Sequence, residues 1–135
     1  MTQYVYSEVT NSLKVTVIPT FLEDISFPKE HNYIWSYNIV LENLGKDTVQ
    51  LLSRYWQIID KFGQIQEVNG PGVVGQQPIL KPGEAFEYTS HAQLRTSSGI
   101  MFGKYHMKSS ENGNEFNIRV PTFSLDIPQE KINLN

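Results

Sequence analysis

The residues most suggestive of chemistry are three glycines in the segment 67–78, EVNGPGVVGQQP. Gly70, Gly72 and Gly75 have the spacing G-x-G-x-x-G, which in dinucleotide-binding proteins lets backbone N–H groups approach a pyrophosphate. That chemistry requires a helix directly after the glycines, because the helix N-terminus holds the anion. Prolines at positions 78 and 82 interrupt any helix there, so a dinucleotide-binding βαβ unit is excluded.

Two interpretations of this loop remain open. In the first, the glycines are structural and provide positive φ angles and close packing at the end of a β-structure. In the second, consecutive N–H groups form a small nest for a phosphate or a nucleotide polyphosphate. Pro71 has no N–H, which leaves that nest one donor fewer. The candidate ligand-binding residues are Gly70, Gly72, Val73, Val74 and Gly75, assisted by Arg54, Lys81 and Arg95.

No metal centre, cofactor or catalytic residue is predicted. His31, His91 and His106 are far apart in sequence, and no histidine pair has the spacing of a metal site. The nucleophile elbow G-x-S-x-G is missing, and no carboxylate pair is set apart by apolar neighbours. We therefore expect a protein that is not an enzyme. His106 alternates with apolar residues, so it is expected to face outward as an ordinary strand residue.

The elements that would position these residues are strands, because apolar side chains recur with period two. Tyr33, Trp35, Tyr37, Ile39 and Leu41 share one face of the clearest strand, 33–42. Further strands are predicted at 13–17, 49–60, 64–69, 86–89, 101–107 and 116–120. About seven strands without an amphipathic helix indicate an all-β fold. We expect an antiparallel β-sandwich of the immunoglobulin or fibronectin type III kind.

Local signals refine this expectation. The strand 49–60 changes phase, so a β-bulge is predicted near Ser53. Residues 60–63 are predicted to form a hairpin turn, and Asn112-Gly113 a type I′ turn between the last two strands. Trp56 is expected to fill the core between the sheets, and the same is expected of Trp35 unless its face proves exposed.

Length and composition indicate one domain over residues 1–135, with its core at about 9–128 and a loose polar tail at 129–135. A net charge of −3 gives no reason to expect a nucleic-acid or anionic-membrane partner. The chain has no cysteine, no apolar run long enough to span a bilayer and no signal-peptide pattern at its start. We expect a soluble, cytoplasmic protein.

The order and spacing of several segments are similar to those of the bacterial ApaG family. These segments are VQLLSRYW (49–56), GPGVVGQQP (70–78), LKPGE (80–84), FEYTS (86–90), SGIM (98–101) and VPTFSL (120–125). The resemblance covers about residues 9–128 and implies a fibronectin type III-like sandwich. It also implies an interaction or ligand-recognition module, and an indirect connection to cobalt resistance and magnesium efflux. The family's signature glycines fall on Gly70, Gly72 and Gly75, and Pro71 stands where an acidic residue is commoner.

The sequence therefore predicts a non-enzymatic binding module with an unidentified protein partner. The alternative is a sensor of anions or nucleotide polyphosphates that uses the loop from Gly70 to Gly75. An enzyme acting on nucleotide polyphosphates is the least favoured class. A binding module predicts an exposed apolar face or a sheet edge free for pairing, and such an edge would also allow a homodimer.

Overall fold

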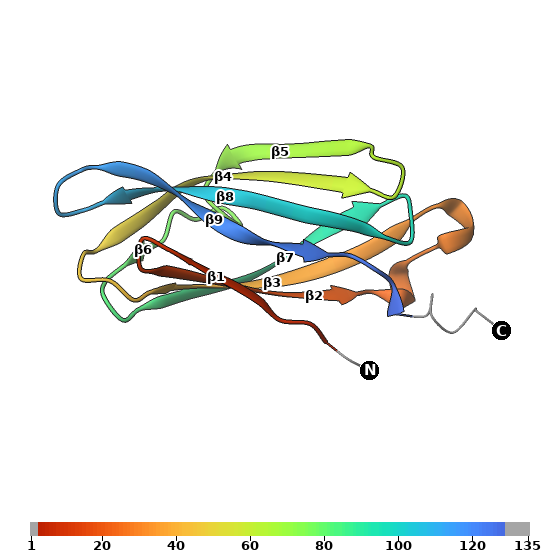
Figure 1. Cartoon of the computed structure of the whole chain (residues 1–135), viewed down its shortest axis with the longest axis horizontal. Coiled ribbons are helices and arrows are strands. Elements are labelled where there is room, and N and C mark those ends of the chain that lie inside the picture. The colour runs from red at the N-terminus through yellow and green to blue at the C-terminus, as the bar shows by residue number, and fades with distance from the viewer. Residues whose placement is uncertain (1–2, 129–135) are drawn as a thin grey trace.

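The fold is a two-layer antiparallel β-sandwich, seen in a computed structural model that describes residues 3–128 (Figure 1). Two short 3₁₀ turns, η1 (Glu23–Ile25) and η2 (Pro28–Glu30), connect β2 to β3. The predicted all-β sandwich is confirmed, and the predicted tail at 129–135 lies outside the described residues. One sheet has the order β1 (Tyr6–Thr10), β2 (Leu13–Phe21), β3 (Tyr33–Asn43) and β7 (Ala85–Leu94). The other has the order β5 (Ile65–Pro71), β4 (Val49–Asp60), β8 (Gly99–Ser109) and β9 (Glu115–Ser124), with β6 (Ile79–Leu80) paired to the start of β4.

The core lies between the two sheets and follows the period-two pattern. Trp56 is 1% exposed and its ring contacts Tyr37, Tyr105 and Phe123 at centroid distances of 5.4, 6.1 and 6.2 Å. The prediction that Trp56 fills the core is confirmed. Trp35 is also buried, so its strand face belongs to the core and is not an exposed binding patch.

The predicted β-bulge in β4 is confirmed. The register between β4 and β8 shifts between Leu51 and Ser53, so Leu51 and Trp56 both face inward although one number is odd and the other even. A second shift between β8 and β9 lies at Met101 and Gly103. After the first shift, the even-numbered side chains of β4 face the core and the odd-numbered ones face outward.

The turns follow the sequence signals only in part. The hairpin at 60–63 is confirmed, with the Gly63 N–H donating to the Asp60 carbonyl at 3.0 Å. The turn at 111–114 joins β8 and β9, but its predicted type I′ geometry is wrong, because Gly113 has a positive φ of 74° and Asn112 does not. A type I′ turn instead joins β1 and β2 at Asn11 and Ser12, with φ of 50° and 63°.

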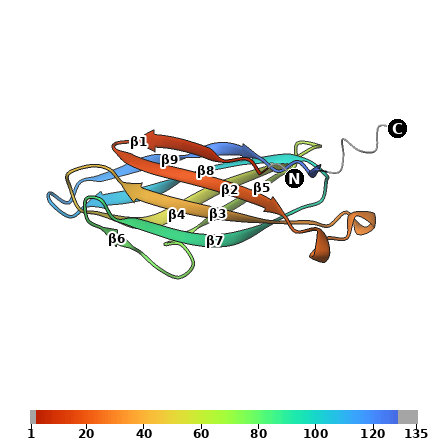
Figure 2. The same cartoon turned by 90° about the horizontal axis from the view of Figure 1, so that it is seen from below.

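The two sides of the sandwich are closed in different ways. On one side β1 lies beside β9 (Figure 2), and Glu8 forms an ion pair with Arg119 at 3.3 Å. On the other side β5 and β7 are both outer strands, and a hydrogen bond of 3.0 Å from the Gln66 side chain reaches the Gln93 carbonyl. Within residues 3–128, no helix has the length and apolarity needed to cross a membrane.

Candidate functional site

The glycine loop packs against the open side of the sandwich. It leaves β5 at Pro71 and returns to β6, and both of these strands pair with the same edge of β4. The Gly72 N–H donates to the Leu52 carbonyl at 2.8 Å, and Val73 and Gln76 exchange two backbone hydrogen bonds of 2.8 Å. Val73 is fully buried within the hydrophobic core. The loop is therefore a small hairpin that is anchored to the core by one apolar side chain.

Two of the three signature glycines have backbone conformations that favour glycine. Gly72 has φ +60°, and a Cβ there would lie 2.2 Å from the Gln76 carbonyl oxygen. Gly75 has φ +78° and forms a type I′ tip with Val74, whose φ is +41°. A Cβ at Gly70 would lie 3.2 Å from the Arg54 guanidinium. The first interpretation of the loop thus has a geometric basis at Gly72 and Gly75, whereas Gly70 only lies close to a flexible side chain.

Arg54 is the predicted cation that reaches the loop. Its Nη1 donates to the carbonyl oxygens of Pro71 and Gly72, both at 3.0 Å. These are acceptors of the loop and not its N–H donors, so the guanidinium fastens the loop. Its charge also acts on two buried tyrosines, Tyr88 and Tyr105, whose hydroxyls lie 2.5 Å apart. Burial raises the pKa of both hydroxyls, and the Arg54 charge opposes part of that rise.

Lys81 and Arg95 lie at opposite ends of β4. Lys81 follows Leu80, which pairs with Val49 at the start of that strand. Arg95 precedes Thr96, whose hydroxyl accepts a hydrogen bond from the Lys61 N–H just beyond its end. At about 3.3 Å per residue, these ends are roughly 36 Å apart. The structure therefore does not gather the three predicted cations around one loop.

The tip of the loop keeps two free donors. The N–H groups of Val74 and Gly75 have no acceptor among the described residues, and Val74 is 52% exposed. Both residues have left-handed backbone conformations, which for a β-branched side chain is unfavourable. The proposed anion nest is thereby reduced to these two adjacent N–H groups.

A free strand edge is the other candidate site. All residues of β5 have exposed side chains except Gly70, which is half-buried. Hydrogen bonds from Asp60 to Gln64 and from Gly72 to Leu52 fix the phase of the ladder between β4 and β5. In an antiparallel ladder, residues that are hydrogen-bonded to the neighbouring strand alternate with residues that are not. The main-chain groups of Ile65, Glu67 and Asn69 therefore point away from β4. These groups form an unpaired edge, and the nearby apolar residues Phe62 and Ile65 are 82% and 58% exposed.

The outer face of the five-stranded sheet carries a polar cluster that sequence reasoning missed. His106 faces outward as predicted, but Asn117 and Glu115 of β9 bind its two ring nitrogens at 2.9 and 2.5 Å. The hydrogen bond with Glu115 is the largest cause of a raised His106 pKa. These contacts join adjacent strands, so the register of β8 against β9 is needed to find them.

Metal-ligating side chains do not cluster in the described part of the chain. No three His, Cys, Asp or Glu residues there are close enough together to hold an ion. Glu115 is the acidic side chain that pairs with His106, and it does so from the adjacent strand β9.

Comparison with known proteins identifies the family. The ApaG domain matches residues 23–109 of this chain. A protein named ApaG from Brucella canis is 51% identical over 130 residues, which are 96% of this chain and 99% of that protein. One from Paramagnetospirillum magneticum is 52% identical over 130 residues, with the same coverage. A crystal structure described as ApaA from Bordetella pertussis is 42% identical, with a TM-score of 0.84, and the match covers 87% of this chain and 94% of that one. This chain, which carries the glycine loop and the free β5 edge, therefore belongs to the ApaG domain family.

Proposed function

We propose that this protein is a non-enzymatic binding module that recognises an extended segment of a partner protein by strand addition at β5. The observation that carries the proposal is the unpaired edge formed by Ile65, Glu67 and Asn69. An added strand would receive main-chain hydrogen bonds from this edge, while side-chain contacts supply specificity. The exposed Phe62 and Ile65 would provide apolar contacts at one end.

The surroundings of β5 favour addition of another strand over closure by the chain itself. Native sheets usually shield such edges with prolines, charges, short strands or covering loops. β5 has seven residues, and both of its faces are exposed. Its charged residue is Glu67, whose carboxylate accepts a hydrogen bond from the Tyr55 hydroxyl at 2.5 Å. The edge therefore remains long and lightly protected.

A second copy of the chain is a less favourable occupant in one symmetric register. If Glu67 lies opposite Glu67 of the other copy, like charges oppose each other directly on one face. A partner segment with a basic or neutral residue at that place avoids this repulsion. The proposal places the module in the cytoplasm and assigns any connection with cobalt or magnesium to its partner.

The test uses matched variants of the edge. Peptides selected from a random display library on the wild-type protein are measured against Glu67→Ala and Glu67→Pro. Both variants lose the carboxylate, but only proline removes the outward N–H and blocks the edge. We expect the peptides to bind Glu67→Ala and to lose at least about tenfold in affinity for Glu67→Pro, which is about 1.4 kcal/mol. Equal binding to both variants would refute strand addition at β5.

A second candidate function is an anion sensor at the loop, favoured by the free N–H groups of Val74 and Gly75. Titration of ¹⁵N-labelled protein with pyrophosphate would then shift these two amides saturably at sub-millimolar concentrations. The amides of Gly72 and Gln76 already bind protein carbonyls and serve as internal controls. No saturable shift at Val74 and Gly75 would leave the loop with a structural role alone.

A further inference from the structure

The outer face of the five-stranded sheet holds a shallow hollow with a volume of about 220 Å³. Two cross-strand rows of side chains form it. Tyr55 and Lys104 are register partners in one row, and Ser53, His106 and Asn117 are partners in the next. Partners in adjacent strands have Cβ atoms about 4.5–5.5 Å apart, so these side chains converge on one place. This surface adjoins the β5 edge at Asn69, whereas no residue of the glycine loop from Gly70 to Gly75 lines it.

The row through His106 presents a fixed amide donor. The His106 Nδ1 lies 2.9 Å from the Asn117 Oδ1, and its Nε2 lies 2.5 Å from the Glu115 carboxylate. In the protonated imidazole both ring nitrogens donate to these two oxygens, and the hydrogen bond with Glu115 raises the His106 pKa in favour of that form. The oxygen of the Asn117 amide is thereby occupied, and its NH₂ group remains free to donate. The charge of Glu115 is balanced by the imidazolium.

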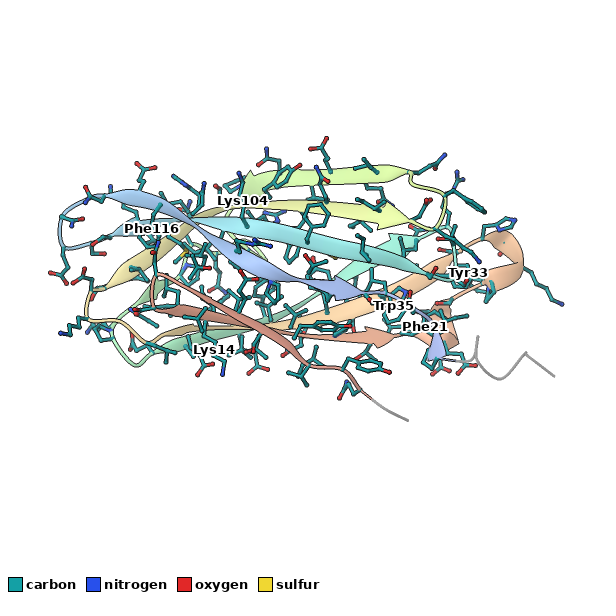
Figure 3. All side chains as sticks on the ribbon, viewed as in Figure 1. Lys14, Phe21, Tyr33, Trp35, Lys104 and Phe116 are labelled. Carbon is teal, nitrogen blue, oxygen red and sulfur yellow. The ribbon has the colours of Figure 1, made fainter. Side chains whose placement is uncertain are left out.

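The row through Lys104 presents an unpaired ammonium. Lys104 Nζ lies 5.6 Å from the centre of the Tyr55 ring, and no carboxylate of residues 3–128 lies within 4.0 Å of it. Figure 3 shows Lys104 on the five-stranded sheet, far from Lys14 of the opposite sheet. The Asn69 amide and the Ser53 hydroxyl also line the hollow, and neither makes a side-chain hydrogen bond within the described chain.

The charge of this face differs from that of the whole chain. The chain carries a net charge of −3. The outer face carries Lys104, His106, Lys108 and Arg119 as basic groups and Glu67 and Glu115 as acidic groups, and Arg119 is also paired with Glu8 of β1. Both acidic groups already accept a hydrogen bond from a neighbour. The unsatisfied groups around the hollow are thus donors with an excess of positive charge.

We propose that this hollow binds a phosphate group, with Lys104 as the charged anchor and the amides of Asn117 and Asn69 and the hydroxyl of Ser53 as further donors. A tetrahedral dianion offers acceptors in several directions, which suits donors that come from four strands. The volume of about 220 Å³ is below the roughly 300–1,000 Å³ of pockets that enclose drug-sized ligands. The site therefore suits one phosphate group, either as the free ion or as the head of a small monoester.

The experiment is a titration of ¹⁵N-labelled full-length protein with inorganic phosphate and, separately, with glycerol 3-phosphate. We expect saturable shifts of the side-chain amides of Asn69 and Asn117 and of the backbone amides around Lys104. Lys104→Gln should weaken binding about tenfold or more, because a charge-assisted hydrogen bond is lost. Lys108→Gln is the matched control, since it makes the same charge change on the same face but does not line the hollow. It should change affinity less than about twofold.

The two ligands distinguish the two sources of phosphate. Tighter binding of glycerol 3-phosphate would identify an organic monoester, and equal binding would identify the free ion. The proposal is overturned if neither ligand gives saturable shifts, or if Lys104→Gln and Lys108→Gln weaken binding equally. Shifts confined to Val74 and Gly75 would also overturn it, because they would place the anion at the glycine loop.

Discussion

Replacing Gly72 by alanine should destabilise the protein by about 2 kcal/mol more than the same change at Gly75, because only Gly72 adds a steric clash. At Gly75 a Cβ would meet no atom within 4 Å, so the cost comes from φ +78° alone. That cost is about 1–2 kcal/mol for an L-residue, partly offset by the reduced entropy of the unfolded chain, about 0.4–1 kcal/mol. At Gly72 the same strain is joined by a Cβ placed 2.2 Å from the Gln76 carbonyl oxygen.

Local release of the loop sets an upper limit on this effect. Opening the hairpin would expose Val73, which is worth roughly 1.5–3 kcal/mol. It would also break the two hydrogen bonds from Arg54, each of which is worth about 1.5–3 kcal/mol because the donor is charged. Urea unfolding of both variants, compared at equal m-values, measures the difference. Equal losses in the two variants would show that the loop relaxes freely, and would refute its role as an anchored part of the sandwich.

Three further changes test other parts of the structure. Gly103→Ala should lower the free energy of unfolding by about 3 kcal/mol or more, because its Cβ would lie 2.2 Å from a β4 carbonyl oxygen. Urea unfolding should show this as a much lower midpoint. Tyr105→Phe should cost about 1–3 kcal/mol by leaving the Tyr88 hydroxyl unpaired, and the double change to Phe should cost less than the sum of the single changes. The Glu115 carboxylate raises the pKa of His106 above 6.5, so its stabilisation is complete below pH 6.5 and is lost as pH rises through the higher folded pKa. Unfolding measured against pH should lose this step in His106→Gln, and a variant that keeps it would contradict the assignment.

The strands were predictable because half-buried strands leave a period-two pattern. The segment 33–42 alternates clearly, and the structure has β3 there. The bulge in β4 was predictable for the same reason, since a change of phase requires an extra residue. β1 and β6 escaped prediction because neither contains a run of alternating buried apolar residues.

Turn geometry and the candidate sites depend on contacts that the sequence does not display. Asn112-Gly113 is a strong type I′ signal, yet the loop between β8 and β9 is longer than two residues and takes another geometry. The rows that bring Lys104 beside Tyr55 depend on cross-strand register. Of the three cations predicted to assist the loop, Arg54 reaches it because it lies on the adjoining strand β4.

The alternating edge of β5 has a kinetic consequence. N–H groups of Gln66, Val68 and Gly70 point to β4, whereas those of Ile65, Glu67 and Asn69 point to solvent. Amide hydrogens along this one strand should therefore exchange with deuterium at two alternating rates, slow and fast, in the free protein. A bound strand would convert the fast positions to slow ones and leave the others little changed, so that occupancy of the edge becomes readable residue by residue.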